Sequence, residues 1–412
     1  GHGAVGAYQS ITKRFKWLGW LGIAAAALIF SFYSALGGYC LRYVVVNFGN
    51  LIGAEFGTNG VGGTDVFQGL LSQPDVSIAF ALAFMLITML VVMSGVGGGI
   101  ERVCSVGMPA LFFILIICII RSCTLPGAVD GLKYMFVPGW AVANGIIDEA
   151  PGFWRVLTAA GGQMFFSLSL GAGVMITYGS YLDKKQDLGK STMIIVGMDT
   201  VVALMAGLCV IPGRFALDPN GALGGPELLF ITMQNVFDKM GPAGPVFGIL
   251  FYLLVFFAAI SSSISLLEVI VAHFCDKARE KGKGDRRKLY SAIVVVICAA
   301  LCALVCADGM GSNHISPAEL LGLAGAKLPG WSTSWLGLFD SVAEGLLMPL
   351  GALLMCLMIS WELKPDTLRQ EILLNGENRP WVYDFFRLCV KYITPLCMLM
   401  ILYGQISDFF IV

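Results

Sequence analysis

Long apolar runs, separated by glycine, proline or charged residues, dominate the pattern along the chain. The clearest runs are 78–93, 110–120, 249–260, 293–305 and 346–359. One helix needs roughly 20 apolar residues to cross a bilayer core of about 30 Å. With their less apolar flanks, the runs predict nine membrane helices, near 17–46, 76–95, 106–125, 158–182, 191–213, 244–275, 289–307, 340–361 and 386–411.

The composition agrees with this interpretation. Of the 412 residues, 57% are hydrophobic and 13% are charged, whereas soluble domains average about 25% charged residues. A transmembrane β-barrel would show short alternating segments in place of continuous apolar runs, so that class is excluded. Because no soluble domain fits between the expected helices, residues 1–412 are expected to form a single domain of an all-α polytopic membrane protein.

The distribution of cations predicts the orientation of these helices. The segment 48–75 contains acidic residues but no Lys or Arg, whereas cations gather before the first, after the fourth and after the sixth expected helix. Because cytoplasmic loops carry an excess of Lys and Arg, the cationic side is expected to be cytoplasmic and 48–75 to face outward. The cations are Lys13, Arg14, Lys16, Lys184, Lys185, Lys190, Lys277, Arg279, Lys281, Lys283, Arg286, Arg287 and Lys288.

One expected helix, 158–182, contains a segment that favours a break. Residues 162–173 read GQMFFSLSLGAG. Glycine destabilises a helix, and serine hydroxyls offer hydrogen bonds to unwound backbone. Such backbone persists at membrane depth only when it is buried in protein or lines a cavity, and transporters use it to bind ions and substrates. The alternative is a glycine kink that only serves helix packing.

A polar face on the helix 244–275 is the second sign of a site. Its members follow i, i+3, i+4, i+7 spacing and therefore share one side of the helix. They are Ala258, Ser261, Ser262 and Ser265, with Glu268 and Asp276 continuing roughly along the same face. Hydroxyl oxygens are hard ligands of the kind that sodium prefers. The alternative is that these hydroxyls bond the carbonyls of their own helix and join helices together.

Two carboxylates lie within expected membrane helices. Asp199 is near the start of the helix 191–213, and Glu268 is in the helix 244–275. Carboxylates in spanning segments are costly and usually face a cavity or a partner. The alternatives are an interfacial position without a role for Asp199 and a structural hydrogen bond to a neighbouring helix for Glu268.

Several motifs together resemble the neurotransmitter:sodium symporter family, and specifically its bacterial amino-acid branch. They are GAVGAY at 3–8, GIER at 99–102 with Met108-Pro109, FFSLSLG at 165–171 with ITYGSY at 176–181, Asp199 with Ala206-Gly207 and Ile211-Pro212, and FAAISSSISLLE at 257–268. The resemblance implies a LeuT-like fold, built from two inverted repeats that each open with a broken helix.

This register makes the first expected helix the family's third and the helix 158–182 its broken sixth. Only one broken helix is found in the sequence, although the inverted repeats require two. We therefore expect that two helices precede Gly1, so that the chain is N-terminally incomplete and holds about nine of eleven helices, the family's third to eleventh.

The resemblance also implies two sodium sites and a substrate pocket. One sodium ion would be bound by the Ala258 carbonyl and the Ser261 and Ser262 hydroxyls. A second would be bound by Ser167 and Asp199 and completed by the absent first family helix and the carboxylate of the substrate. Tyr33 would donate a hydrogen bond to that carboxylate. The pocket would be lined by Ile29, Phe166, Ser169, Ala172, Ser262, Ser265 and Leu266, with Phe166 as its lid. The small Ala172 side chain favours a bulky apolar or aromatic amino acid.

Chloride and the gates are implied in the same way. Gln163 and Ser167 match ligands that bind chloride in some family members, but Asp199 and Ala203 occupy the other positions. A fixed carboxylate would replace the anion, so transport is expected to be independent of chloride. Asp340 matches the acid of the outer gate. Asp276 and Tyr181 match the inner-gate acid and its tyrosine.

The sequence thus predicts sodium-coupled secondary active symport of an amino acid, by alternating access, in a multi-pass protein of the bacterial inner membrane. No covalent chemistry is needed, no nucleic-acid partner is expected, and the chain lacks a GxxxxGK[ST] segment for ATP. The alternatives are a non-transporting fragment or sensor and a proton-coupled amino-acid permease of similar architecture. In such permeases a cation commonly replaces the sodium ligands, and the face from Ser261 to Ser265 has none.

Overall fold

The computed structural model of the protein describes residues 3–58, 60–182, 186–222, 224–284, 286–323, 330–363, 365–373 and 380–410. Lys184 and Lys185, two of the cations used to predict the orientation, lie outside these ranges. All regular structure within the described ranges is helical. The predicted all-α class is confirmed.

Eight helical segments of the described chain are long and apolar enough to cross a membrane. They are α2 (Leu18–Ile52), α4 (Pro74–Met93), the π turn Val96–Ile100 with α5 (Glu101–Cys123), α10 (Leu188–Leu217), α13 (Gly244–Glu280), α14 (Arg287–Asp308), α16 (Trp335–Val342) with the π turn Ala343–Leu347 and α17 (Met348–Trp361), and α19 (Pro380–Leu388) with the π turn Cys389–Ile393 and α20 (Thr394–Phe410). The remaining predicted helix is divided into α8 (Phe153–Ser167) and α9 (Val174–Gly179), as its sequence indicated.

Shorter helices connect the long ones. They are α1 (Ala4–Ile11), α3 (Gly63–Leu71), α6 (Ala128–Phe136), α7 (Trp140–Ala143), α11 (Gly225–Glu227), α12 (Met233–Lys239), α15 (Pro317–Leu320) and α18 (Pro365–Leu373). The apolar runs did not predict them, because helices this short do not span a membrane and need no continuous hydrophobic stretch.

The predicted helix bounds differ most from the structure at α5. Its helical segment begins at Val96, whereas the sequence predicted a start near 106. The residues 97–99 are all glycine, which disfavours regular helix there. A π turn nevertheless forms over Val96–Ile100, and a Cβ on Gly99 would lie 2.2 Å from the carbonyl oxygen of Val91. Glycine is therefore required for the backbone of this turn to approach the end of α4.

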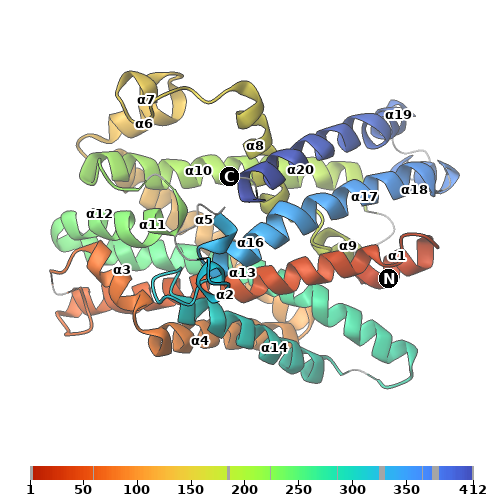
Figure 1. Cartoon of the computed structure of the whole chain (residues 1–412), viewed down its shortest axis with the longest axis horizontal. Helices are drawn as coiled ribbons and strands as arrows, with labels where there is room; N and C mark the ends of the chain where they lie inside the picture. Colours follow the sequence, from red (N-terminus) through yellow and green to blue (C-terminus); the bar gives the residue numbers. More distant parts are fainter. Residues whose placement is uncertain are drawn as a thin grey trace.

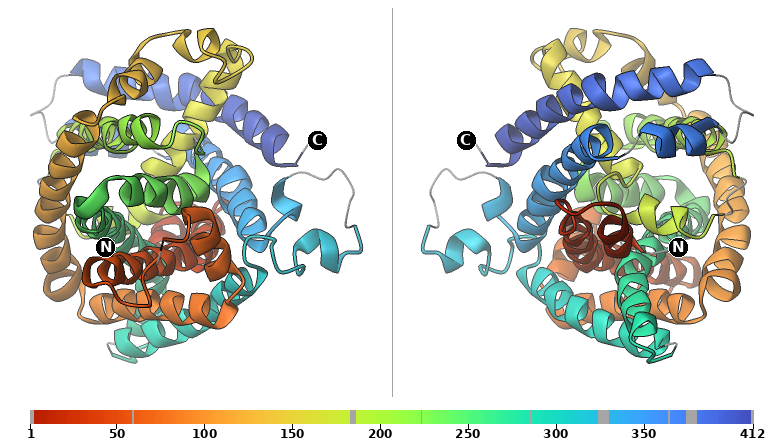
Figure 2. Two further views of the ribbon diagram at one scale, coloured as in Figure 1. Left: turned by 90° about the vertical axis from the view of Figure 1, so that its left-hand side faces the viewer. Right: turned by 90° about the vertical axis from the view of Figure 1, so that its right-hand side faces the viewer.

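The long helices lie side by side along the horizontal axis of Figure 1 and form a bundle when viewed along that axis in Figure 2. Helix α2 packs against α4, α13 and α14, and 67% of its membrane-spanning window is buried, compared with 6% for α10. The helices α6 and α7 lie at the edge of the bundle (Figure 2). The arrangement places α2 in the interior and leaves α10 at the periphery.

Small residues allow α2 and α4 to approach each other closely. A Cβ on Gly37 would lie 2.5 Å from the ring of Phe84, and one on Gly38 would lie 2.5 Å from the backbone nitrogen of Ala81. Both glycines are buried. Close approach through small residues is typical of membrane helix pairs, which associate by packing and not by exclusion of water.

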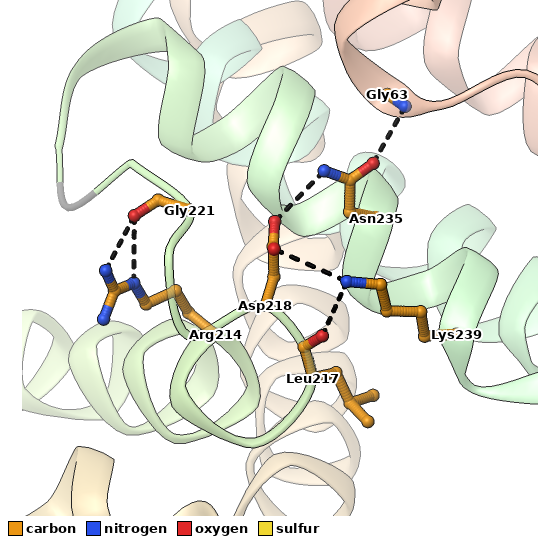
Figure 3. A network of polar contacts seen from close by, with 7 residues as sticks. All are labelled: Gly63, Arg214, Leu217, Asp218, Gly221, Asn235 and Lys239. Atoms are coloured by element: carbon orange, nitrogen blue, oxygen red, sulfur yellow. Dashed lines mark hydrogen bonds and ion pairs between the residues drawn. The ribbon is translucent and has the colours of Figure 1, made fainter.

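A polar network joins α10, α12 and α3 on the side predicted to face outward (Figure 3). The guanidinium of Arg214 donates to the carbonyl oxygen of Gly221 from Nε at 3.2 Å and from Nη2 at 2.7 Å. Asp218 accepts a hydrogen bond from Asn235 at 3.0 Å, and the Asn235 Oδ1 accepts one from the backbone N–H of Gly63 at 2.8 Å. These bonds fix the segment after α10 and the start of α3 relative to each other.

Candidate functional site

The break between α8 and α9 is the first part of the site. Helical backbone ends at Ser167 and resumes at Val174. Positive φ angles occur between them at Ser169 (51°), Gly171 (80°) and, at the cap of α9, Gly173 (75°). A Cβ on Gly171 would lie 2.2 Å from the carbonyl oxygen of Met348, so no other residue fits at this position. Ser169 adopts the same region without being glycine, which costs about 1–3 kcal/mol and is typical of functional sites.

This break leaves acceptor groups unused at the depth of the membrane. Among the residues that the structure describes, no hydrogen-bond donor reaches the carbonyl oxygens from Leu168 to Ala172. An unpaired backbone group away from water is costly. These oxygens are therefore suited to a cation or to a donor on a bound molecule, as the sequence interpretation of the break requires.

A cavity of about 970 Å³ lies next to the break, and we call it the central cavity. Its walls come from α2, the π turn Val96–Ile100 with α5, α8 and α9 with the segment between them, α10, α13 and the start of α17. All eight residues predicted to bind substrate line it, namely Ile29, Tyr33, Phe166, Ser169, Ala172, Ser262, Ser265 and Leu266. Ala258, Ser261, Ser167, Gln163 and Tyr181 line it as well. The structure thus brings together residues that lie as far apart in the sequence as Ile29 and Leu266.

The polar face of α13, from Ala258 to Ser265, lines this cavity. The Ser261 hydroxyl donates to the carbonyl oxygen of Ala258 at 2.8 Å, and the Ser265 hydroxyl donates to the carbonyl oxygen of Ser261 at 3.2 Å. Ser265 also lies 2.9 Å from the hydroxyl of Tyr178 on α9. The i, i+3, i+4 spacing therefore places carbonyl and hydroxyl oxygens next to one another, which is the type of donor set that a sodium ion needs.

Ser167 and Asp199 form a direct contact between α8 and α10. The Ser167 hydroxyl donates to Oδ1 of Asp199 at 2.6 Å. Ser167 is the last residue of α8, so the carboxylate sits at the start of the break. Ala203 follows Asp199 by one helical turn on α10 and offers no hydroxyl. Ser167 and Asp199 are the two residues of this chain that the resemblance assigned to a second sodium site.

Of the residues predicted to form gates, Tyr181 and Asp276 are not joined by a hydrogen bond. Tyr181 donates to Oε1 of Glu268 at 2.6 Å, whereas Asp276 accepts from the backbone N–H of Gly3 at 2.7 Å. Asp340 is on α16 and does not line the central cavity. The sequence associated Tyr181 with Asp276, and the structure instead pairs it with the other acidic residue of α13.

Glu268 is the centre of a cluster of polar side chains. Its side chain is completely buried, and Arg287 donates to both carboxylate oxygens, with Nη2 to Oε1 at 2.8 Å and Nη1 to Oε2 at 2.5 Å. Arg287 also donates to the carbonyl oxygen of Val92 at the end of α4, at 3.3 Å. We call Tyr181, Glu268 and Arg287 the Glu268 cluster. It connects the segment after α9 with α13, α14 and α4.

Comparisons with known proteins decide the family. The model of the Sodium:neurotransmitter symporter family matches residues 64–410. The chain belongs to this family. It is 35% identical to an uncharacterized sodium-dependent transporter, YhdH, of Bacillus subtilis, over 98% of this chain and 83% of that protein. It is 27% identical to an uncharacterized sodium-dependent transporter of Methanocaldococcus jannaschii, over 89% of this chain and 70% of the relative.

A solved structure extends the likeness to three dimensions. The crystal structure of MhsT in complex with L-phenylalanine superposes with a TM-score of 0.79 at 31% sequence identity, covering 98% of this chain and 85% of MhsT. The symporter therefore has the LeuT-like fold that its motifs predicted. It is a sodium-dependent transporter and a multi-pass membrane protein, and it is not an enzyme.

Sequence reasoning about the symporter missed the role of Arg287. The sequence analysis uses this residue only as one of the cations that indicate the cytoplasmic side. A signal was nevertheless available, since Glu268 within an apolar helix requires a partner and Arg287 is the first residue of the next long helix. The structural alternative stated for Glu268, a bond to a neighbouring helix, describes the observed contacts.

Proposed function

We propose that the symporter couples sodium entry to the uptake of a bulky apolar or aromatic amino acid across the inner membrane of a bacterium. The observation that carries this proposal is the central cavity. There, Ser169 and Ala172 of the segment between α8 and α9 line the same space as the serine face of α13, and no donor in the described part of the chain bonds their carbonyl oxygens. A cation and a zwitterion both require such oxygens when they leave water.

The first sodium site is assigned to the Ala258 carbonyl and the Ser261 and Ser262 hydroxyls. Ser261 Oγ lies 2.8 Å from the Ala258 oxygen, so both oxygens are available to one ion after the hydroxyl rotates. Ser262 lines the cavity beside them. Neutral oxygens compensate for the lost hydration of sodium without binding it so tightly that release would be slow.

The second sodium site is assigned to Ser167, Asp199 and the substrate carboxylate. The 2.6 Å bond between Ser167 and Asp199 holds a fixed negative charge at the break. This charge supplies the balance for sodium that a chloride ion gives in other family members, and Ala203 has no hydroxyl to bind chloride. Transport is therefore proposed to be independent of chloride, with Gln163 as a remnant of the chloride site.

The substrate pocket is assigned to the residues of the central cavity nearest the break. Ile29, Phe166 and Leu266 provide apolar walls, Tyr33 provides a hydroxyl for the substrate carboxylate, and Ala172 leaves space for a large side chain. The related MhsT was crystallised with L-phenylalanine. A relative at lower coverage is named a sodium-dependent nutrient amino acid transporter of Drosophila ananassae, 29% identical over 52% of this chain and 33% of that protein.

In the proposed mechanism, sodium and the amino acid bind together because the substrate carboxylate completes the second sodium site. The bundle then changes between outward-open and inward-open states around them. Asp340 is proposed to act at the outer gate, and Asp276 and Tyr181 at the inner one. Opening of the inner side would require the Glu268 cluster to separate, since Tyr181 connects the segment after α9 to α13.

Uptake into proteoliposomes tests this proposal. With the full-length protein, labelled L-phenylalanine is expected to accumulate under an inward sodium gradient and not when potassium replaces sodium. Glycine is expected to accumulate far less. Ser262→Ala should lower uptake at least tenfold, whereas Ser263→Ala should not, because Ser263 is buried on the same helix and does not line the central cavity.

The same experiment separates the competing functions. Accumulation driven equally by a proton gradient without sodium would favour a proton-coupled permease. Binding of amino acids without any accumulation would favour a sensor or a non-transporting fragment. Either result would overturn the proposal, while a loss confined to the Ser262→Ala protein would assign the polar face of α13 to sodium.

A further inference from the structure

A second cavity, of about 250 Å³, lies between α2, α3 and the start of α4. It shares no lining residue with the central cavity, and we call it the outer cavity because these elements are on the side predicted to face outward. Val46, Val66 and Val76 give it apolar walls. Its size suits a molecule or a headgroup with about ten non-hydrogen atoms, since larger ligands occupy sites of roughly 300–1,000 Å³.

Arg42 brings a positive charge into the outer cavity. Its guanidinium carbon lies 5.9 Å from the centroid of the Phe80 ring on α4. No ion pair found in the described part of the chain includes Arg42. Phe80 follows the first residue of α4, Pro74, by six residues, which places the pair about 9 Å below the outer end of that helix at 1.5 Å per residue. A guanidinium at this depth is costly without a counter-ion.

Asp65 places a negative charge in another wall of the same cavity. It is in the first turn of α3 and is exposed. The start of α3 is fixed by the bond from the Gly63 N–H to Asn235 shown in Figure 3, so this wall is held in position. Arg42 and Asp65 both line the cavity but do not form an ion pair. The cavity therefore has a positive and a negative pole that are kept apart.

We propose that the outer cavity binds a zwitterion, with an oxyanion at Arg42 and a primary ammonium group at Asp65. Two sources share this chemistry. One is the headgroup of phosphatidylethanolamine from the outer leaflet, which carries a phosphate and an ammonium group. The other is a free amino acid taken from the outside. A phospholipid without an ammonium group, such as phosphatidylglycerol, would satisfy only Arg42.

Native mass spectrometry of the full-length protein tests the lipid source. The protein is released from nanodiscs that contain equal amounts of phosphatidylethanolamine and phosphatidylglycerol, and retained lipids are counted. Wild type is expected to retain phosphatidylethanolamine over phosphatidylglycerol at least fivefold. Arg42→Gln should abolish this retention. Asp65→Asn should abolish only the preference, because the phosphate of either lipid would still meet Arg42.

Equilibrium binding tests the free amino acid. In nanodiscs of phosphatidylglycerol alone, labelled L-phenylalanine is counted as molecules bound per protein. If the source is a free amino acid, Arg42→Gln removes one bound molecule and leaves sodium-dependent binding at the central cavity. Failure of the proposed transport function would not affect either experiment, because neither measures transport.

Arg121 provides a matched control. It also lies over an aromatic ring, with its guanidinium carbon 5.9 Å from the centroid of Phe247, but the cavity that it lines is only about 10 Å³. Arg121→Gln should therefore leave both measurements unchanged. The proposal is overturned if Arg42→Gln matches wild type in both experiments, or if Arg121→Gln has an equal effect. Should Arg42→Gln fold poorly, Arg42→Lys and the exposed Asp65→Asn provide the test.

Discussion

Ser169, Gly171 and Gly173 together make the break a permanent feature of the chain. Glycine populates positive φ readily, whereas an interior helix position would favour almost any other residue. Gly171 has a second constraint, since the Met348 carbonyl occupies the space where a side chain would be. The unwound backbone is thus held in part by its steric fit with α17.

Gly171→Ala is expected to destabilise the protein by more than 1 kcal/mol. The added methyl group meets backbone in α17, and its φ of 80° is strained for alanine. The midpoint of thermal unfolding in detergent should fall by several degrees. Gly197→Ala on α10 is the control, because nothing lies within 4 Å of its Cβ position. Equal midpoints for the two variants would contradict the steric argument.

Asp199 is expected to determine the response to chloride. In Asp199→Asn the fixed charge beside Ser167 is lost, so sodium-driven uptake in gluconate medium should fall at least tenfold, which corresponds to about 1.4 kcal/mol. Chloride should restore part of the lost uptake by supplying an anion, while wild type should transport equally in both media. Strong dependence of the wild type on chloride would refute the role assigned to Asp199.

At the scale of elements, the Glu268 cluster joins four segments through one buried carboxylate. Removing one partner of a buried ion pair leaves an uncompensated charge, which typically costs about 3–5 kcal/mol. Replacing both partners by uncharged residues avoids that cost. The cluster therefore contributes to specificity of packing between α13, α14 and the end of α9 more than to net stability.

A double-mutant cycle checks this argument. Arg287→Met should destabilise the protein strongly, because Glu268 is completely buried, whereas Arg287→Met combined with Glu268→Gln should be more stable than Arg287→Met alone. Unfolding midpoints in detergent measure the coupling. Additive effects of the two substitutions would show that Arg287 does not balance the charge of Glu268.

The contact between α17 and the segment after α1 predicts a dependence on pH. Thr12 donates to Glu362 at 2.6 Å, and this hydrogen bond lowers the pKa of the Glu362 carboxyl below its usual 4.5. A lowered pKa in the folded state stabilises the protein above the ordinary pKa, and the stabilisation is lost as the pH falls through the lowered value. Thermal midpoints should therefore drop more between pH 5 and about 3 in wild type than in Glu362→Gln. Identical pH profiles would contradict the assignment.

At the scale of the whole molecule, apolar length, glycine and hydroxyl spacing predicted the spanning helices, the break and the polar face of α13. These are local signals, and they hold in the folded protein because backbone groups in lipid must be hydrogen-bonded within the protein. The substrate residues that line the central cavity followed only from the resemblance to the family. The partner of Tyr181 was not predictable in this way. It depends on the relative placement of α9, α13 and α14, so the structure pairs Tyr181 with Glu268 and not with Asp276. The outer cavity depends in the same way on how α3 packs beside α2.

Sodium binding should be visible as stabilisation of the whole bundle, because its proposed ligands come from α8, α10 and α13. A ligand that binds only the folded state stabilises it by about 2.7 kcal/mol at a concentration 100 times its Kd. For the full-length protein, sodium chloride should therefore raise the thermal midpoint above that in potassium chloride, and L-phenylalanine should raise it further only with sodium. Ser262→Ala should remove most of this difference and Ser263→Ala should keep it. Equal protection by sodium and potassium would mean that the oxygens at the break and on α13 do not select the smaller ion, and the coupling proposed here would have no physical basis.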